Sequence, residues 1–383
     1  MTQAGDRVRL ALTGDVMTGR GMDQLFTHAS APRLFEPFVQ DAREYVALAE
    51  RRNGPIARPI AYDYVWGDAI AEWRAAAPDV RIINLETSIT TSADHDRGKE
   101  IHYRMHPANV ACLRAASIDV CVLANNHVLD WGRAGLEETL DTLERNGLEV
   151  AGAGRDRPSA EAPAIVERPG GRVIVYACGS GDSGIPGRWA AGERQPGVNL
   201  LSDLSPGVAR AIGARLARVR RPGDLAVVSI HWGSNWGYDV LPSHVAFAHA
   251  LVDAGVDVVH GHSSHHARPI EIYRDRVVLY GCGDFINDYE GIEGYEQYRG
   301  DLSLIYLPTL DARSGALVSL RLVPMRIARM RLRRASPSET AWLRETLDRV
   351  SAPFGTRVTL DGDHRLSVAG IPAARGPIEP AAR

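Results

Sequence analysis

Cysteine is scarce in this sequence, and the residues that occur are far apart. Four are present, at positions 112, 121, 178 and 282, and no two of them form a C-x-x-C pair. This spacing argues against a thiolate metal site and against a disulfide framework. We therefore expect four buried, reduced thiols that behave as small apolar side chains, which fits a reducing compartment.

Long apolar runs and an excess of one charge are absent as well. No segment approaches the roughly 18 consecutive apolar residues of a membrane span, and the N-terminus lacks the basic-then-apolar pattern of a secretory signal. The 44 basic and 47 acidic residues leave a formal net charge of −3. This balance excludes broad attraction to nucleic acid or to an anionic membrane. We expect a cytoplasmic protein with no membrane span and no nucleic-acid partner.

What the sequence does contain is a regular alternation of short apolar runs and segments with helical periodicity. Because strands joined by helical crossovers pair in parallel, this alternation predicts an α/β fold with helices on the sheet faces. We expect strands at 8–12, 80–85, 120–123, 173–177, 226–230 and 256–259. We expect helices at 69–77, 107–116, 134–147 and 243–254, and a further helix within 202–220.

The last third of the chain has a different pattern. Apolar runs at 276–280, 302–307 and 316–323 follow one another without helices, and 311–315 has a turn composition, which predicts an antiparallel sheet portion. Ser336 and Glu339 fit a capping box and predict a helix over 337–350. We expect one large domain over 1–325, an appendage of strand and helix packed on it over 326–370, and a disordered tail over 371–383.

Five of the predicted strands end in polar side chains. These side chains are, in chain order, Asp15, Glu86, Asn125, Asn126, His127, His231, His260, His262, His265 and His266. In open α/β sheets, ligands bind at the carboxyl edge of the strands. Five endings of this kind therefore predict one shared polar site, whereas a single one would carry little weight.

The residue types at these strand ends are those of a metal site with acid/base groups. Carboxylate and amide oxygens suit hard divalent ions, and imidazole suits zinc, iron and manganese. The candidate ligands are Asp15, Glu86, Asn126, His231, His262 and His265. His127 is the candidate general acid or base, with Asp15 and His265 as further proton-transfer groups. Glu86 is also compatible with a brace for Arg20 or Arg104, and His260 and His266 with buried structural roles.

Four residues near the strand ends are candidates for contact with the substrate, namely Arg20, Asn125, Trp232 and Trp236. Arg20 suits an anionic group but equally a structural ion pair. The two tryptophans suit a substrate wall or the packing of a glycine-rich loop. Apolar and basic residues alternate over 325–334, which indicates the solvated face of a strand or, alternatively, a surface that binds a polyanion.

Six short motifs occur in a set order and carry a family resemblance. They are Gly14-Asp-Val-Met-Thr-Gly-Arg20, Asn84-Leu-Glu86, Asn125-Asn-His127, His231-Trp-Gly233, Gly261-His-Ser-Ser-His265 and Tyr280-Gly-Cys-Gly-Asp-Phe285. Over residues 8–310 the chain resembles the CapA (PgsA-like) family of bacterial capsule and poly-γ-glutamate synthesis proteins. That family in turn resembles the calcineurin-like metallophosphoesterases. The resemblance implies a metallophosphoesterase-like sandwich of two mixed β-sheets flanked by helices, with a C-terminal antiparallel portion.

The same resemblance implies roles for individual residues. Asp15 matches the first metal-binding aspartate, Asn126 matches a metal-binding asparagine, and His127 matches the acid near the leaving group. His231 and His262 match the two later histidine blocks.

The chain departs from the phosphoesterase pattern at three points. Met17 stands where the phosphoesterases carry a histidine ligand, Asn84-Leu-Glu86 replaces their second aspartate block, and His265 comes one residue late. These departures argue against a complete two-metal phosphoesterase site, and we expect a single divalent ion of manganese, iron or zinc, or none.

These features predict a metal-assisted hydrolase or transferase that acts on a phosphoester or on a peptide-like substrate of the poly-γ-glutamate type. One alternative is a metal-independent enzyme such as a peptide epimerase, in which Asp15 with His265 or His127 moves a proton on and off an α-carbon. Another is a non-catalytic accessory protein of capsule polymer biosynthesis.

Overall fold

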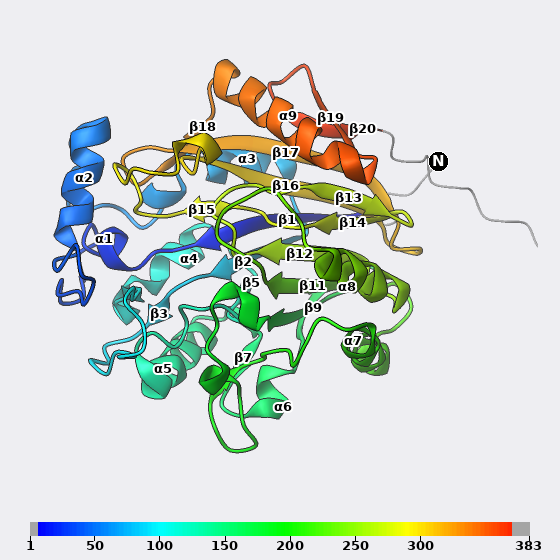
Figure 1. The fold of residues 1–383 in the computed structure, drawn as a ribbon, viewed down its shortest axis with the longest axis horizontal. Coiled ribbons are helices and arrows are strands. Elements are labelled where there is room, and N and C mark those ends of the chain that lie inside the picture. Colours follow the sequence, from blue (N-terminus) through cyan, green and yellow to red (C-terminus); the bar gives the residue numbers. More distant parts are fainter. Residues whose placement is uncertain (1–6, 370–383) are drawn as a thin grey trace, which may run out of the picture.

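Two large β-sheets lie face to face at the centre of the molecule, in the computed structural model, which describes residues 7–369 (Figure 1). The ten-stranded sheet has the order β19 (Arg357–Leu360), β20 (Leu366–Ala369), β17 (Leu317–Ile327), β16 (Leu302–Asp311), β1 (Arg7–Val16), β2 (Val80–Leu85), β5 (Val120–Val122) and β6 (Glu149–Ala151), with β15 (Asp284–Ile286) on β1 and β18 (Leu332–Arg334) on β17. The six-stranded sheet has the order β13 (Ile270–Tyr273), β14 (Arg276–Leu279), β12 (Val258–His262), β11 (Leu225–His231), β9 (Gly171–Gly179) and β8 (Ala164–Arg168).

Strand β1 shows how the sequence builds both faces of a buried sheet. Val8, Leu10 and Leu12 belong to the core between the two sheets, whereas Ala11 belongs to the core on the opposite face. This alternation follows from the two-residue period of a strand. Strands buried on both faces are typical of sheets that are covered by helices.

Helices cover the outer face of each sheet. The ten-stranded sheet is covered by α2 (Arg43–Asn53), α3 (Ala69–Ala76), α4 (Ala111–Ala115) and α5 (Gly132–Arg145), and the six-stranded sheet by α7 (Pro206–Val219) and α8 (Pro242–Asp253). Helix α9 (Pro337–Ser351) inserts Leu343 and Leu347 into the core between the sheets. The remaining short α-helices and strands are α1 (Arg20–Asp23), β3 (Ser88–Ile89), β4 (Arg104–Met105), α6 (Arg157–Ala160), β7 (Ala153–Gly154) and β10 (Gly197–Val198). The predicted sandwich of two mixed sheets flanked by helices is confirmed.

The pairing of the strands follows the sequence pattern in most places. Strands β1, β2, β5 and β6 pair in parallel, as do β9, β11, β12 and β14. The helices predicted at 69–77, 134–147, 202–220, 243–254 and 337–350 correspond to α3, α5, α7, α8 and α9, and 107–116 becomes a 3₁₀ turn followed by α4. The capping box of Ser336 and Glu339 is present at the start of α9.

One strand of the last third lies in a different sheet from the one predicted. Strands β16 and β17 form the expected antiparallel hairpin around 311–315, but β14 pairs in parallel with β12 in the six-stranded sheet. The cause is the hairpin between β13 and β14, whose turn residues Arg274 and Asp275 both have left-handed φ angles, of 48° and 60°. A turn of this kind usually carries glycine or asparagine, so its sequence signal is weak here.

The expectations drawn from scarce residues have different outcomes. All four cysteines are buried free thiols, as predicted. Among the helices of residues 7–369, none combines the length and the hydropathy needed to cross a membrane. The tail predicted over 371–383 lies outside the described residues.

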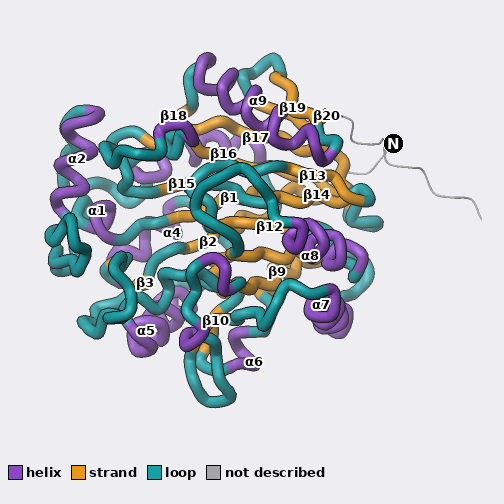
Figure 2. The backbone as a smooth tube through the Cα atoms, in the orientation of Figure 1, coloured by secondary structure: helices purple, strands orange, loops and turns teal. Residues whose placement is uncertain are grey.

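The carboxyl ends of β1, β2 and β5 in one sheet and of β11 and β12 in the other lead to the same edge of the sandwich (Figure 1). Figure 2 shows that this edge is formed largely by loops. Loops on a rigid scaffold are where binding and catalytic side chains concentrate. The fold therefore brings the polar strand ends together.

Candidate functional site

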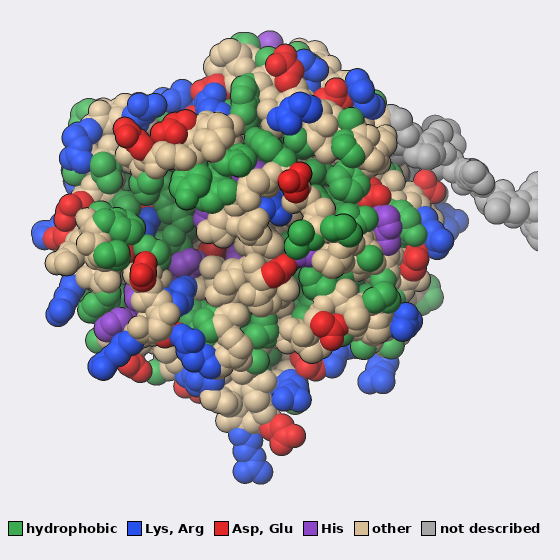
Figure 3. Space-filling model, viewed as in Figure 1, with side chains coloured by type: hydrophobic (Ala, Val, Ile, Leu, Met, Phe, Trp, Pro, Cys, Tyr) green, Lys and Arg blue, Asp and Glu red, His purple; other side chains and the backbone are tan. Residues whose placement is uncertain are grey.

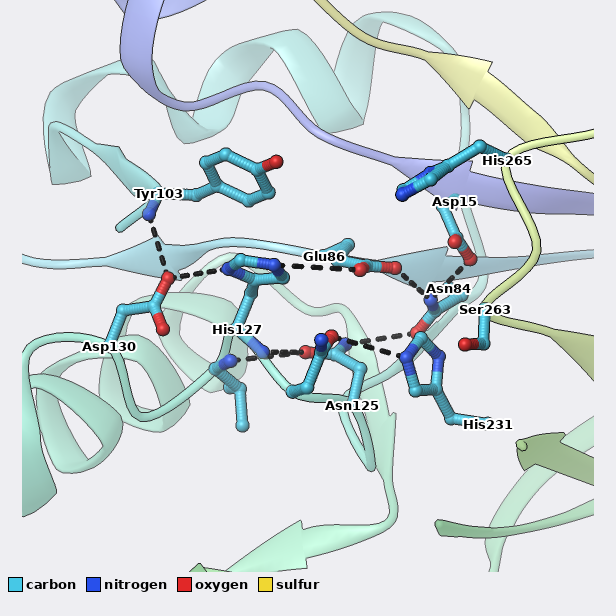
Figure 4. A network of polar contacts seen from close by, with 12 residues as sticks. Asp15, Asn84, Glu86, Tyr103, Asn125, His127, Asp130, His231, Ser263 and His265 are labelled. Carbon is cyan, nitrogen blue, oxygen red and sulfur yellow. Dashed lines mark hydrogen bonds and ion pairs between the residues drawn. The ribbon is translucent and has the colours of Figure 1, made fainter. Parts of the chain in front are cut away.

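The site is a cluster of buried acids, amides and imidazoles drawn from both sheets (Figure 4). Asp15 lies in β1, Glu86 follows β2, and Asn126 and His127 follow β5. The six-stranded sheet contributes His231 and His262 at the ends of β11 and β12, and His265 from the loop beyond β12. Figure 3 shows histidine side chains inside a recess on this face of the molecule.

Asp15 reaches the site through an irregularity in β1. Leu12 pairs with Ile82 and Asp15 with Asn84, so β1 has one more residue than β2 between the two pairs, which is a β-bulge. On its other side, Gly14 touches Gly283 so closely that a Cβ on Gly14 would come within 1.6 Å of the Gly283 carbonyl oxygen. The Asp15 N–H donates to that oxygen at 3.0 Å, which places Asp15 beside Asp284.

Two groups of three side chains could each hold a metal ion. Ligand atoms of Asp15, His231 and His262 lie within 4.8 Å of one another, and so do those of Asp15, His265 and Asp284. Asp15 is common to both groups. A carboxylate shared in this way is typical of sites that bind two divalent ions.

The surroundings of Asp15 fit a cation. Its Oδ1 accepts a hydrogen bond from Asn84 Nδ2 at 2.7 Å, whereas its Oδ2 is buried and accepts none from the described residues. Burial and the neighbouring Asp284 raise the pKa of Asp15 to about 7, and burial and Asp15 raise the pKa of Glu86 well above its usual range. A divalent ion would neutralise this surplus of buried carboxyl groups.

A chain of hydrogen bonds determines which nitrogen of His262 faces Asp15. His260 Nε2 donates to the Thr13 carbonyl at 2.8 Å, so its Nδ1 accepts from Ser229 Oγ at 3.0 Å. Ser229 Oγ in turn accepts from His262 Nε2 at 3.0 Å. Because burial keeps the pKa of both histidines below the usual value, both rings are neutral at pH 7. His262 Nδ1 therefore carries a lone pair and can only accept.

That lone pair faces the imidazole of His231 and the carboxylate of Asp15. His262 Nδ1 lies 2.9 Å from His231 Nδ1 and 4.0 Å from Asp15 Oδ1. On the other side of its ring, His231 Nε2 lies 3.2 Å from Asn126 Oδ1. Metal-binding histidines commonly have their second ring nitrogen held by such a partner, which orients the first toward the ion. The tautomer imposed on His262 thus suits a ligand.

His265 reaches the site through a strained turn. The intervening Ser263 has φ 103°, which few residues other than glycine adopt, and its Oγ donates to the Gly233 carbonyl at 3.2 Å. His265 Nδ1 lies 2.9 Å from Asp284 Oδ1. Burial alone would lower the pKa of His265, but Asp284 outweighs it, so the pKa is raised. The late position of His265 in its motif is thus compensated by the backbone.

His127 forms a dyad with Asp130. Its Nδ1 lies 2.7 Å from Asp130 Oδ2, and the Tyr103 ring stacks on it at 3.9 Å between centroids. Burial lowers the pKa of His127 to about 4, against the opposing effect of Asp130, so the ring is neutral at pH 7. With Nδ1–H donated to Asp130, Nε2 has a lone pair and lies 4.0 Å from Glu86 Oε1. His127 can therefore accept a proton at Nε2.

Two residues of the cluster were missed as candidates by the sequence reasoning. Lys99 Nζ bonds Asp130 Oδ1 at 2.5 Å and also the Asn126 carbonyl. It is the only lysine among the 44 Lys and Arg residues of the sequence. A lysine kept in a chain that otherwise uses arginine could have indicated a specific role. Asp284 lies within the motif 280–285, but nothing near it in the sequence indicated that β15 pairs with β1.

Three of the predicted substrate contacts face the protein interior. Arg20 is buried, with Nη1 2.9 Å from Glu36 and Nε 3.0 Å from Asp288. Asn125 Nδ2 donates to Asn84 and to the Leu85 carbonyl, each at 2.9 Å. Trp232 is buried and stacks on His244 at 4.8 Å. The three side chains therefore bind other parts of the protein and stabilise the fold around the site.

Trp236, Glu86 and His266 complete the set of predicted residues. Trp236 lies at the rim, 5.2 Å from the His265 ring, and stacks on the exposed Tyr295 at 4.1 Å. Glu86 Oε2 accepts from Asn84 at 2.9 Å, while Arg20 and Arg104 bond other groups. His266 is buried among aromatic rings, with Tyr298 at 4.6 Å.

The chain is similar to known proteins of one family. The family model of the bacterial capsule synthesis protein PGA_cap matches residues 9–289, a range that contains every site residue from Asp15 to Asp284. A protein of Mycobacterium tuberculosis named "Probable polyglutamine synthesis accessory protein" is 50% identical over 374 residues, which cover 96% of this chain and 97% of the relative. The "PGA biosynthesis protein CapA" of Bacillus subtilis is 27% identical over 288 residues, which cover 75% of this chain and 65% of the relative.

Proposed function

Because the chain belongs to the PGA_cap family of bacterial capsule synthesis proteins, as its motifs predicted, we propose that it is a metal-assisted hydrolase or transferase that acts in the synthesis of a glutamate-type polymer. The bond attacked would be peptide-like or a phosphoester. The names of the relatives support a role in the synthesis of a glutamate-type polymer. The polar cluster supports metal-assisted hydrolysis or transfer.

One observation carries the proposal, which is the carboxylate of Asp15. It is buried, its Oδ2 accepts no hydrogen bond within residues 7–369, and it belongs to both candidate ligand groups. His231 and His262 would complete one ion site and His265 and Asp284 the other, without a contribution from residue 17. A divalent ion of manganese, iron or zinc held there supplies Lewis-acid polarisation of the scissile group.

The residues of the chain itself account for the proton transfers. His127 enters neutral, with its orientation set by Asp130, and can take a proton at Nε2 from the attacking water or hydroxyl group and return it to the leaving group. Glu86 lies 4.0 Å from that nitrogen, and its raised pKa keeps a proton available there. The Tyr103 ring covers one face of His127 and restricts the access of water.

The direct test is hydrolysis by the purified protein supplied with Mn²⁺. We expect release of glutamate from poly-γ-glutamate or of nitrophenol from bis(p-nitrophenyl) phosphate, loss of that activity with EDTA, and its return with Mn²⁺. Asp15→Asn should abolish activity, whereas Glu137→Gln, an exposed change on α5, should not. Activity of the wild type that survives EDTA would contradict the proposal.

A second candidate is supported by a specific observation. The pKa of Asp15 is raised to about 7 and that of His265 is also raised, so both groups can exchange protons near neutral pH. Such a pair suits a metal-independent epimerase. It predicts deuterium uptake at the α-carbon of a glutamyl peptide in D₂O with EDTA present, and loss of that uptake in Asp15→Asn.

A non-catalytic accessory role makes a different prediction. In a strain that depends on this protein for polymer synthesis, both Asp15→Ala and His127→Ala would then restore the polymer as well as the wild type. Failure of either variant at wild-type protein levels would favour an enzyme.

A further inference from the structure

A pocket of about 330 Å³ lies at the hairpin between β17 and β18, outside the candidate site. Four arginines line it, namely Arg326, Arg329, Arg333 and Arg334, together with Asn53 of α2 and Ser336 at the start of α9. Figure 3 shows basic side chains, with acidic ones between them, along the edge of the molecule over β18 and α2. The run over 325–334 that alternates apolar and basic residues thus forms a concave surface.

The positive charge of this arginine pocket is only partly balanced. Glu339, the one acid in its lining, is held by Arg326 at 2.9 Å and by the N–H of Ser336 at 2.8 Å. Arg334 lies 3.6 Å from Glu72, which Arg365 binds more closely at 2.9 Å. The side chains of Arg329 and Arg333 form no ion pair within the described part of the chain. Two guanidinium groups therefore remain without a counter-ion.

Several N–H groups of the pocket also lack acceptors. Nε of Arg333 is buried and donates no hydrogen bond to the described residues. Nε of Arg326 and Nη1 of Arg334 are buried without a hydrogen bond as well, and each has only a longer ion-pair contact, at 3.8 Å to Asp301 and 3.6 Å to Glu72. An unmet buried donor carries a desolvation cost, and that cost is larger for a charged group. An oxyanion in the pocket would meet these donors, because guanidinium groups match the geometry of carboxylate and phosphate.

The backbone of the hairpin is specialised as well. Arg329 and Met330 form its turn with left-handed φ angles of 57° and 50°, although neither is glycine. The Glu290 carboxylate accepts from both of their N–H groups, at 2.8 Å for Arg329. Met330 is fully buried, while Arg329 lines the pocket. Glu290 therefore holds a turn that presents Arg329 to a ligand.

The same segment connects the pocket to the candidate site. Tyr289 lies against His265, with 5.4 Å between ring centroids, and the next residue, Glu290, bonds Asn53 and the backbone of Arg329. One peptide unit thus joins a residue that packs on the site to one that supports the pocket.

We infer that the arginine pocket is an oxyanion-binding site, suited to neighbouring carboxylates of an acidic chain or to a phosphate group. The concave lining and the two guanidinium groups without a counter-ion distinguish the pocket from the plain solvated face of a strand. The binding does not depend on the chemistry proposed above, because none of the pocket residues belongs to the candidate site.

The test compares the wild-type protein with the double variant Arg329→Gln, Arg333→Gln by calorimetric titration. The probes are a glutamate decapeptide and, separately, inorganic phosphate. We expect at least one probe to bind the wild type with an affinity that falls as salt rises, and its Kd to increase on the order of tenfold in the double variant. Arg210→Gln, Arg218→Gln is the matched control, because it removes the same charge from the exposed face of α7.

Each outcome has one meaning. Loss of decapeptide binding alone supports an acidic chain as the ligand, and loss of phosphate binding alone supports a phosphate. Equal loss in the control variant would show that binding follows net charge and would overturn the inference. Failure of the wild type to bind either probe, or unchanged Kd values in a double variant with the wild-type melting temperature, would also overturn it.

Discussion

Asp15 is the residue on which both candidate ion sites depend. In the ion-free protein its carboxyl group holds a proton up to about pH 7, because burial and Asp284 raise its pKa to about 7. An ion that binds to the carboxylate must displace that proton. Affinity should therefore rise with pH up to about 7 and level off above it.

This linkage can be measured with Mn²⁺. We expect the affinity for the first ion to fall by roughly tenfold per pH unit below pH 7, with about one proton released from Asp15 at pH 6 as that ion binds. Calorimetric titration in buffers of different ionisation enthalpy counts the released protons directly. Binding that is equally tight at pH 6 and pH 8, with no proton release, would mean that Asp15 is not a ligand.

Lys99 is the second residue whose role can be isolated. Its ammonium group bonds Asp130 and the Asn126 carbonyl, so it holds the dyad partner of His127 and the residue before His127. We expect Lys99→Met to lower kcat by roughly 10–100-fold with little change in KM, as for other residues that orient ligands and bases. Lys99→Arg should restore only part of kcat, because a planar guanidinium cannot replace a compact ammonium.

Steady-state kinetics of both variants provide the measurement, with thermal unfolding as the check on folding. Full kcat in Lys99→Met would show that the dyad needs no such support. Full kcat in Lys99→Arg would show that positive charge alone is sufficient there.

At the scale of elements, the contact between β1 and the segment before β15 determines the site geometry. A Cβ at Gly14 would lie 1.6 Å from the Gly283 carbonyl oxygen. The backbone of neither segment can move aside at low cost. We expect Gly14→Ala to destabilise the fold by about 3 kcal/mol or more, as severe overpacking does. Urea unfolding measures this, with Gly181→Ala as the control because its Cβ would meet nothing within 4 Å. Equal stability of the two variants would refute the contact.

The elements that the sequence predicted are those with local signals. Helix α9 has its capping box, α5 has leucines at helical spacing, and the apolar strands have polar ends. The missed elements depend on distant or unusual partners. Strand β15 has three residues and pairs with β1 from the far end of the chain, and the β13–β14 turn lacks glycine.

The same contrast between local sequence signals and distant partners explains which site residues could be predicted. The convergence of Asp15, Glu86, Asn126, His127 and the later histidines was foreseeable, because parallel strands share a carboxyl edge. An ion pair was one of the two roles expected for Arg20, but its partners Glu36 and Asp288 were not foreseeable, because they lie in separate loops. Nor could the sequence indicate that Trp232 turns into the core on His244.

At the scale of the whole molecule, the candidate site joins the two halves of the sandwich. The ten-stranded sheet supplies Asp15 and Asp284, and the six-stranded sheet supplies His231 and His262. The core between the sheets fixes their relative position, so the ligand atoms are held in place before an ion arrives. The arginine pocket lies on the ten-stranded sheet and is joined to the site through Tyr289 and Glu290.

The central claim is that Asp15 is shared between two ion sites at this junction. Anomalous diffraction from crystals grown with Mn²⁺ tests it most directly. We expect two manganese peaks at the Asp15 carboxylate, one beside His231 and His262 and one beside His265 and Asp284, and no peak there in Asp15→Asn. Crystals of the wild-type protein that show no peak next to Asp15 would contradict it.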